Sequence, residues 1–160
     1  MKEARSTRFI VILTGCIISV LLFQKSQAQN PDNDIRIVVD RLFDGMRKGD
    51  STMVRSVFLK DNALNSVSKN TNDSTIIRSE GNVEGFIKAV GTPHQEKWDE
   101  RIYNLIIHTD GPMAIVWAPY KFYRGETFSH CGVNVFTLIK VSAEWKIREI
   151  TDTRRKTDCP

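Results

Sequence analysis

The segment FSHCGVNVFTLIKV (residues 128–141), followed after a short turn by WKIREITDTR (residues 145–154), decides the fold class of this 160-residue chain. Apolar and polar side chains alternate along both pieces, which is the period of a β-strand with one buried face. Ser142-Ala143-Glu144 between them reverses the chain, so the two pieces are predicted to form an antiparallel hairpin.

The period of two begins after Trp98 and continues to the end of this hairpin. It predicts two earlier strands, around residues 103–108 and over residues 113–123. Turns are expected at DGP (residues 110–112) and RGE (residues 124–126), where glycine permits a tight reversal. The C-terminal part of the chain is therefore predicted to be a four-stranded antiparallel meander.

Upstream of the strands the apolar spacing is that of an α-helix. The first helix has a stripe at i, i+3, i+4 and i+7 made by Ile35, Val38, Val39, Leu42, Phe43 and Met46. Gly49 is expected to end it. A second, shorter helix then opens at Asp50 or Ser51 and carries the apolar face through Phe58.

Asn82 is expected to cap a third helix over residues 83–90. The polar stretch between the second and third helices, residues 63–80, has two weak strand patterns and no firm assignment. Helices first and strands last predict an α+β domain, with three N-terminal helices packed on a curved antiparallel sheet. The domain is predicted to span residues 29–160.

Residues 1–28 have the pattern of a secretory signal peptide. Basic residues at Lys2, Arg5 and Arg8 precede a 15-residue apolar run, and Ser26-Gln27-Ala28 supplies small residues for cleavage. This run is short for a retained transmembrane anchor, which needs about 18 to 20 apolar residues. We therefore expect an exported protein, periplasmic or secreted, with no membrane attachment after cleavage.

Lipidation at Cys16 is a second interpretation, because Leu13-Thr14-Gly15-Cys16 resembles a bacterial lipoprotein box. Processing there would leave the apolar residues 17–23 at the start of the mature chain, where a polar tether is expected. Cleavage after Ala28 is the preferred interpretation.

Removal of residues 1–28 leaves 19 basic and 18 acidic residues, a net charge of only +1. The basic pI of the whole chain is thus no argument for a nucleic-acid partner. With no CxxC pair and only three separated histidines, a metal site is not predicted, and no motif predicts a cofactor. Two cysteines remain, Cys131 and Cys159, which either form a disulfide in an oxidising compartment or stay as free thiols.

The order of these elements resembles the nuclear transport factor 2-like (NTF2-like) superfamily. The resemblance rests on the first helix ending in Gly49-Asp50, the short second helix, the third helix and the meander finishing in Glu144-Trp145-Lys146-Ile147. Residues 129–133 (SHCGV) and 152–155 (DTRR) are most similar to exported bacterial proteins of the SnoaL-like or lumazine-binding type.

This resemblance implies a cone-shaped domain with a pocket at the open end of a bent sheet, often dimerising through that sheet. The superfamily includes isomerases, cyclases and dehydratases as well as binding modules, so the fold does not choose a function. Asp50 and Asp61 are carboxylates near the early helices, but neither lies in a recognisable catalytic motif. No catalytic residue is carried over.

The register of the last hairpin predicts where a site could lie. A three-residue loop, or a two-residue loop with a bulge near Arg148-Glu149, places Asn134 opposite Asp152 and Phe136 opposite Ile150. One face of the sheet would then gather polar groups beside an apolar floor, as a ligand pocket requires. The ligand-binding candidates are Trp117, Tyr120, Asn134, Phe136 and Arg154.

His130 and Asp152 lie on the same predicted face and are the catalytic candidates, because a histidine near a carboxylate can exchange a proton with a substrate. The alternative is structural: Asp152 and Arg154 form an ion pair, and Asn134 satisfies backbone groups at a bulge. Whether the protein is an enzyme therefore stays open.

Three hypotheses follow. The leading one is an exported domain that binds a small hydrophobic or aromatic molecule in an apolar pocket. The second is an isomerase, cyclase or dehydratase that uses His130 and Asp152. The third is an interaction module that forms a homodimer through outer-face residues Val133, Val135 and Ile139.

Overall fold

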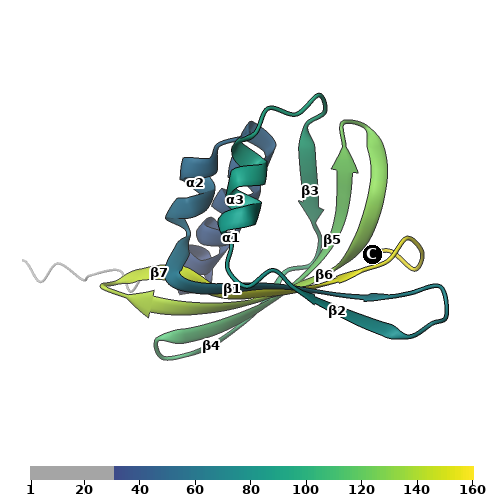
Figure 1. Cartoon of the computed structure of the whole chain (residues 1–160). Helices are drawn as coiled ribbons and strands as arrows, with labels where there is room; N and C mark the ends of the chain where they lie inside the picture. The colour runs from purple at the N-terminus through teal and green to yellow at the C-terminus, as the bar shows by residue number, and fades with distance from the viewer. Residues whose placement is uncertain (1–30) are drawn as a thin grey trace, which may run out of the picture.

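The computed structural model describes residues 31–160, so the predicted signal peptide and the alternative lipidation site at Cys16 lie outside the described residues. Figure 1 shows the helices on one face of a curved sheet. The elements in chain order are α1 (Pro31–Lys48), α2 (Ser51–Ser56), β1 (Phe58–Lys69), β2 (Thr75–Ser79), α3 (Glu84–Gly91), β3 (Trp98–Ile102), β4 (Ile106–Asp110), β5 (Met113–Arg124), β6 (Thr127–Val141) and β7 (Glu144–Arg154).

The sheet has the strand order β2-β1-β7-β6-β5-β3, and β4 also pairs with β5. All pairs are antiparallel except β1 with β7, which run parallel. The expected α+β class with a curved sheet is confirmed, but the sheet is mixed rather than antiparallel. Parallel pairing joins segments far apart in the chain and leaves no local turn signal, so the sequence pattern did not reveal it.

The N-terminal elements differ from the prediction in two places. The second helix ends at Ser56, and Phe58 begins β1 instead of extending the helical face. The two weak strand patterns before the third helix are confirmed as parts of β1 and β2, and because these strands intervene, the three helices do not form one N-terminal block. Asp50 caps α2 as expected, since its carboxylate accepts a 2.8 Å hydrogen bond from the amide of Met53.

The register of the β6–β7 hairpin agrees with the sequence argument. Asn134 pairs with Asp152 and Phe136 with Ile150. The turn takes the two-residue form, because Val141 pairs with Glu144, and a bulge opposite Thr137 and Leu138 restores the predicted outer pairing. This register brings the predicted polar residues to one end of the concave face.

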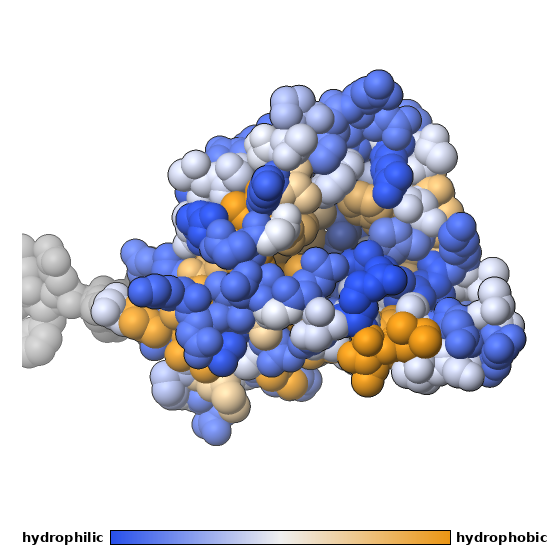
Figure 2. Space-filling model, in the orientation of Figure 1, coloured by the Kyte–Doolittle hydropathy of each residue, from blue (hydrophilic) through white to orange (hydrophobic). Residues whose placement is uncertain are grey.

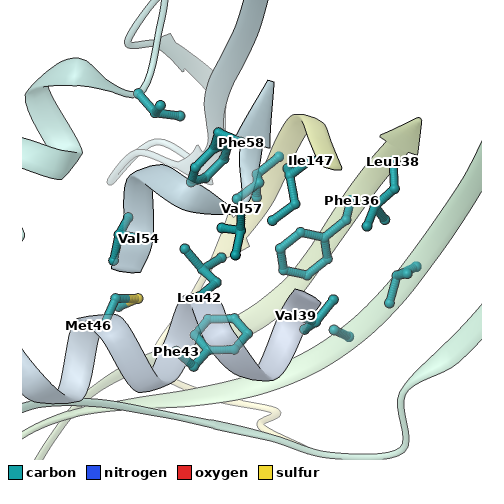
Figure 3. Packing of buried hydrophobic residues seen from close by; sticks show 14 of the residues in the cluster. Val39, Leu42, Phe43, Met46, Val54, Val57, Phe58, Phe136, Leu138 and Ile147 are labelled. Atoms are coloured by element: carbon teal, nitrogen blue, oxygen red, sulfur yellow. The ribbon is translucent and has the colours of Figure 1, made fainter. Parts of the chain in front are cut away.

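The core lies between α1 and the concave face of β6 and β7. Phe43 meets Phe136 edge to face with ring centroids 6.2 Å apart, and Leu42, Leu138 and Ile147 are almost fully buried. Figure 3 shows α1, the residues after α2 and these strands contributing to one apolar cluster. This cluster fills the space between the helices and one end of the sheet. Towards the other end of the sheet, a cavity remains between the helices and the strands.

A disulfide joins Cys131 in β6 to Cys159 in the C-terminal tail and closes a loop with a sequence separation of 28. Cross-linking a loop of that length restricts the unfolded chain and should stabilise the fold by about 3 kcal/mol. We expect Cys159→Ser to lower the free energy of unfolding by about that amount in urea denaturation. The same urea midpoint for the wild type with and without reductant would contradict this expectation.

Candidate functional site

A cavity of about 280 Å³ lies between α1, α3 and the concave face of the sheet. Figure 2 shows a hollow between α3 and the neighbouring strands, with apolar side chains along its edge. Its apolar wall includes Leu42, Phe43, Met46, Leu64, Phe86, Phe136 and Ile150. Most of its polar side chains come from the strands, among them Glu100, His130, Asn134, Asp152 and Arg154.

Five of the seven predicted site residues line this one cavity: His130, Asn134, Phe136, Asp152 and Arg154. Tyr120 belongs to the same face but is only 1% exposed, and its ring lies beneath the polar group. It contributes through its hydroxyl, which reaches Asp152. The hairpin register therefore gathers the polar candidates as the sequence predicted.

Trp117 is the exception, because it lies on the opposite face of the sheet and is 50% exposed. Successive side chains of a strand point to opposite faces, so Trp117 and Tyr120, three residues apart on β5, cannot share one face. The expectation that both aromatics line the pocket was wrong for Trp117.

Asp152 is the shared hydrogen-bond acceptor of the polar group. Its carboxylate accepts hydrogen bonds from the hydroxyl of Ser66, from Tyr120 at 3.0 Å and from Nε of Arg154 at 2.8 Å. Ser66, Tyr120 and Arg154 belong to β1, β5 and β7, so one carboxylate ties three strands together. The Asp152–Arg154 ion pair considered from the sequence is present, and the acceptor capacity of Asp152 is largely used within the protein.

Tyr120 is held as a hydrogen-bond donor. Burial and the neighbouring negative charge of Asp152 raise the pKa of the Tyr120 phenol well above its usual range. The hydroxyl donates to Asp152 and to the carbonyl of Thr153, both at 3.0 Å. The hydroxyl therefore stays protonated, and its hydrogen bond helps to hold Asp152 in position.

His130 is half-buried and contacts aromatic rings. Its centroid lies 5.1 Å from that of Phe122 and 5.8 Å from that of Tyr120, and its Nδ1 lies 3.0 Å from Oγ of Ser129. Burial, followed by the positive charge of Arg154, lowers the pKa of His130. The neutral imidazole is therefore favoured at physiological pH, a form that can accept a proton.

Glu100 is the cavity residue that the sequence argument missed. It lies on β3, and one of its carboxylate oxygens accepts a 2.7 Å hydrogen bond from Nδ2 of Asn134. Burial raises the pKa of Glu100 to about 7, and the negative charge of Asp152 adds to this, whereas the hydrogen bond from Asn134 acts in the opposite direction. The sequence does contain an indication of this position. Trp98, Glu100 and Ile102 are every second residue of one strand, so the carboxyl of Glu100 lies on the same face as the two apolar side chains.

The raised pKa of Glu100 predicts how stability depends on pH. The folded protein holds this proton more tightly than the unfolded chain, so the stabilisation is complete below the ordinary value of 4.5 and is lost as pH rises through about 7. Because the side chain keeps some solvent access, we expect a loss of about 1–2 kcal/mol between about pH 5 and pH 8. Urea denaturation should show this slope in the wild type, and an equal slope in Glu100→Gln would contradict the assignment.

Within residues 31–160, no group of three or more His, Cys, Asp or Glu side chains is arranged to hold a metal ion. None of the helices described there is long and apolar enough to cross a membrane.

Residues 30–149 match the model of the family described as "Putative lumazine-binding". This match covers most of the chain, including the helices and nearly all of the sheet. The chain belongs to this lumazine-binding family. A comparison with curated proteins found no match.

Solved structures agree on the fold of this lumazine-binding family member. An NTF2-like protein of unknown function from Shewanella baltica OS155 aligns with a TM-score of 0.57 and 17% identity over 79% of this chain and 95% of that chain. An NTF2-like protein with a cystatin-like fold from Novosphingobium aromaticivorans has a TM-score of 0.62 and 12% identity, over 79% and 83% of the two chains.

A third structure, a "Putative Scytalone Dehydratase" from Novosphingobium aromaticivorans, has a TM-score of 0.61 and 14% identity over 78% of this chain and 84% of that one. Identities this low establish the fold alone. The NTF2-like superfamily membership expected from the sequence is confirmed, and the role of the cavity has to be argued from its own residues.

Proposed function

We propose that this protein is an exported domain that binds a small, partly apolar molecule in the cavity between α1, α3 and the sheet. The observation that carries the proposal is the composition of the cavity. Aromatic and aliphatic side chains form one part, and Glu100, Asn134 and His130 converge at the other. Such a division suits a ligand with an apolar body and a polar end.

Export is supported by the pattern of residues 1–28 and by the Cys131–Cys159 disulfide. Disulfides persist mainly in oxidising compartments such as the periplasm and the extracellular space. Mass measurement of the mature N-terminus tests this part of the proposal. A chain starting near Gln29 supports cleavage, and a lipidated Cys16 would replace it with membrane anchoring.

Blocking the cavity tests the binding proposal. Ala89 lines the cavity from α3, and Ala89→Trp would place an indole in the hollow. Once a thermal-shift screen of small metabolites has found a stabilising ligand, we expect Ala89→Trp to weaken its binding at least tenfold, which is about 1.4 kcal/mol. The matched control is Lys88→Trp, since Lys88 is the exposed neighbour on the same helix.

The affinity of Lys88→Trp should equal that of the wild type. Equal weakening by both substitutions would point to damage to α3 rather than to a blocked cavity. Unchanged binding in Ala89→Trp would place the ligand elsewhere and refute the proposal.

Acid–base catalysis is the second candidate function, as in an isomerase, cyclase or dehydratase. It is favoured by the location of His130 and Asp152 in one cavity. The fold shared with a structure described as a dehydratase is consistent with it. The three hydrogen bonds already made by Asp152 fit an orienting role better than direct proton transfer. Turnover of a ligand found by the screen, abolished by His130→Gln with binding retained, would establish catalysis.

A sheet-mediated dimer is the third candidate and concerns the outer face. Apolar side chains are exposed there at Ile106, Met113, Ile115 and Trp117, whereas Val133, one of the expected contacts, is only 9% exposed. Val135 and Ile139 are partly exposed. Light scattering tests this candidate, and a monomer at high concentration would remove it.

A further inference from the structure

In the part of the chain that the structure describes, the carboxylate of Glu100 differs from those of Asp99 and Asp152 in forming no ion pair, although Arg47 donates a hydrogen bond to the backbone carbonyl of Glu100. Within residues 31–160, Arg47 and Arg101 form ion pairs with Asp99, and Arg154 pairs with Asp152, whereas Glu100 forms none. Its single side-chain hydrogen bond comes from the neutral amide of Asn134. A carboxylate with little solvent access and no counter-ion is destabilised, so the charged form of Glu100 is favoured when a cation from outside the protein lies beside it.

Aromatic rings flank this carboxyl. Phe122 is the cross-strand partner of Glu100, and Trp98 precedes Glu100 by two residues on the same face of β3. The Trp98 and Phe122 rings meet edge to face with centroids 6.2 Å apart. Phe86 of α3 lines the same cavity. A carboxylate among aromatic faces is an arrangement that attracts an organic ammonium group, through charge and through cation–π contact.

The charges around the cavity agree with a positively charged ligand. The lining includes three acidic side chains, Glu80, Glu100 and Asp152, and two basic ones, Arg124 and Arg154. Asp152 already pairs with Arg154, His130 favours its neutral form, and Glu80 and Arg124 are exposed. The remaining acidic group away from the exposed rim is Glu100. One ammonium group would neutralise it, whereas an anionic ligand would place a second negative charge beside Glu100.

We infer that the cavity binds a compact aromatic or alicyclic amine, with its ammonium group against Glu100 and its ring against the apolar wall. This inference rests on the proposed function and names the chemical class of the ligand. The cavity of about 280 Å³ is at the small end of ligand pockets, which limits the ligand to one or two rings.

Three probes with one ring system and different head groups test the inference. 1-Naphthylmethylamine, 1-naphthalenemethanol and 1-naphthoate are titrated into the purified protein by calorimetry at about pH 8. We expect the amine to bind at least tenfold more tightly than the alcohol, and the naphthoate most weakly. Glu100→Gln keeps the shape of the side chain and removes its charge, so the amine and the alcohol should bind this variant with similar affinity.

The pH dependence gives a second readout that does not need a variant. An amine that requires ionised Glu100, with its pKa of about 7, should bind about tenfold more tightly at about pH 8 than at about pH 6. The other charged or titratable groups that line this cavity or contact Glu100 are Arg47, Glu80, Tyr120, Arg124, His130, Asp152 and Arg154. A pH dependence that survives in Glu100→Gln would belong to one of these groups and would overturn the assignment to Glu100.

Failure of the amine inference and failure of the proposed function give different results. Equal affinity for the amine and the alcohol, abolished for both by Ala89→Trp, would overturn the amine class and keep the pocket. Absence of binding by all three probes would count against the pocket itself. His108→Ala is the control for a titratable group away from the cavity, since His108 is exposed on β4, and its profile should match that of the wild type.

Discussion

Gly132→Ala is expected to destabilise the protein by at least about 4 kcal/mol, a large part of the total stability of a small domain. A Cβ at position 132 would lie 1.7 Å from the carbonyl oxygen of Thr153 and 2.7 Å from its carbonyl carbon. Both are backbone atoms of the neighbouring strand, so no side-chain rotation relieves the clash. Strands β6 and β7 would have to separate at this position.

A matched substitution of the same chemistry controls for the loss of glycine. Gly85 lies on α3, and a Cβ built there meets no atom within 4 Å. Gly85→Ala should therefore be neutral or stabilise the helix by about 0.5–1 kcal/mol. Urea denaturation of both variants checks the pair, and similar stabilities for Gly132→Ala and Gly85→Ala would contradict the close approach of β6 and β7.

Asp152→Ala is the second large expected effect, with a loss of about 3–5 kcal/mol in the free energy of unfolding. The substitution leaves the hydroxyls of Ser66 and Tyr120 without their shared acceptor in a buried place, and it leaves Arg154 without its ion-pair partner. Tyr120 keeps one bond, to the carbonyl of Thr153, which limits its share of the loss.

A double-mutant cycle separates the network from simple packing. Asp152→Ala removes the acceptor of the hydrogen bond, and Tyr120→Phe removes the donor while keeping the ring in place. If the bond contributes as described, the two losses measured by urea denaturation should fail to add by about 1 kcal/mol. Strict additivity would show that Asp152 and Tyr120 act independently and would contradict the network.

The sequence alone predicted those parts of the fold that depend on local periodicity. The stripe from Ile35 to Met46 gave α1, and the alternation along β6 and β7 gave a hairpin whose register places Asn134 opposite Asp152. These two predictions succeed because the period of a helix or strand and the length of a turn are encoded in neighbouring residues. Most of the polar side of the cavity follows from that register.

The parts that failed depend on partners distant in the chain. Nothing near Phe58 indicates that it begins a strand parallel to β7, because its partner in that strand pairing, Ile147, lies far away in the sequence. Glu100 escaped notice for a similar reason. Its strand is short and polar, and its importance depends on contact with Asn134 on another strand.

Trp117 shows a different kind of error. An aromatic residue near a predicted pocket is an attractive candidate, but the parity of β5 assigns it to the outer face together with Ile115. Applying the two-residue period to every strand, as was done for the last hairpin, would have excluded Trp117 and included Glu100. A candidate site residue needs both a suitable side chain and a position in its strand that points to the cavity face.

The central claim is that the hollow between α1, α3 and the sheet is a binding site for a small molecule. A two-dimensional amide NMR titration of the purified protein with the tightest of the naphthyl probes tests it most directly. We predict saturable shift changes centred on Phe86, Glu100 and Asn134, with Ile115 and Trp117 on the outer face unaffected. Changes confined to the outer face, or no saturable change at any concentration, would contradict the claim.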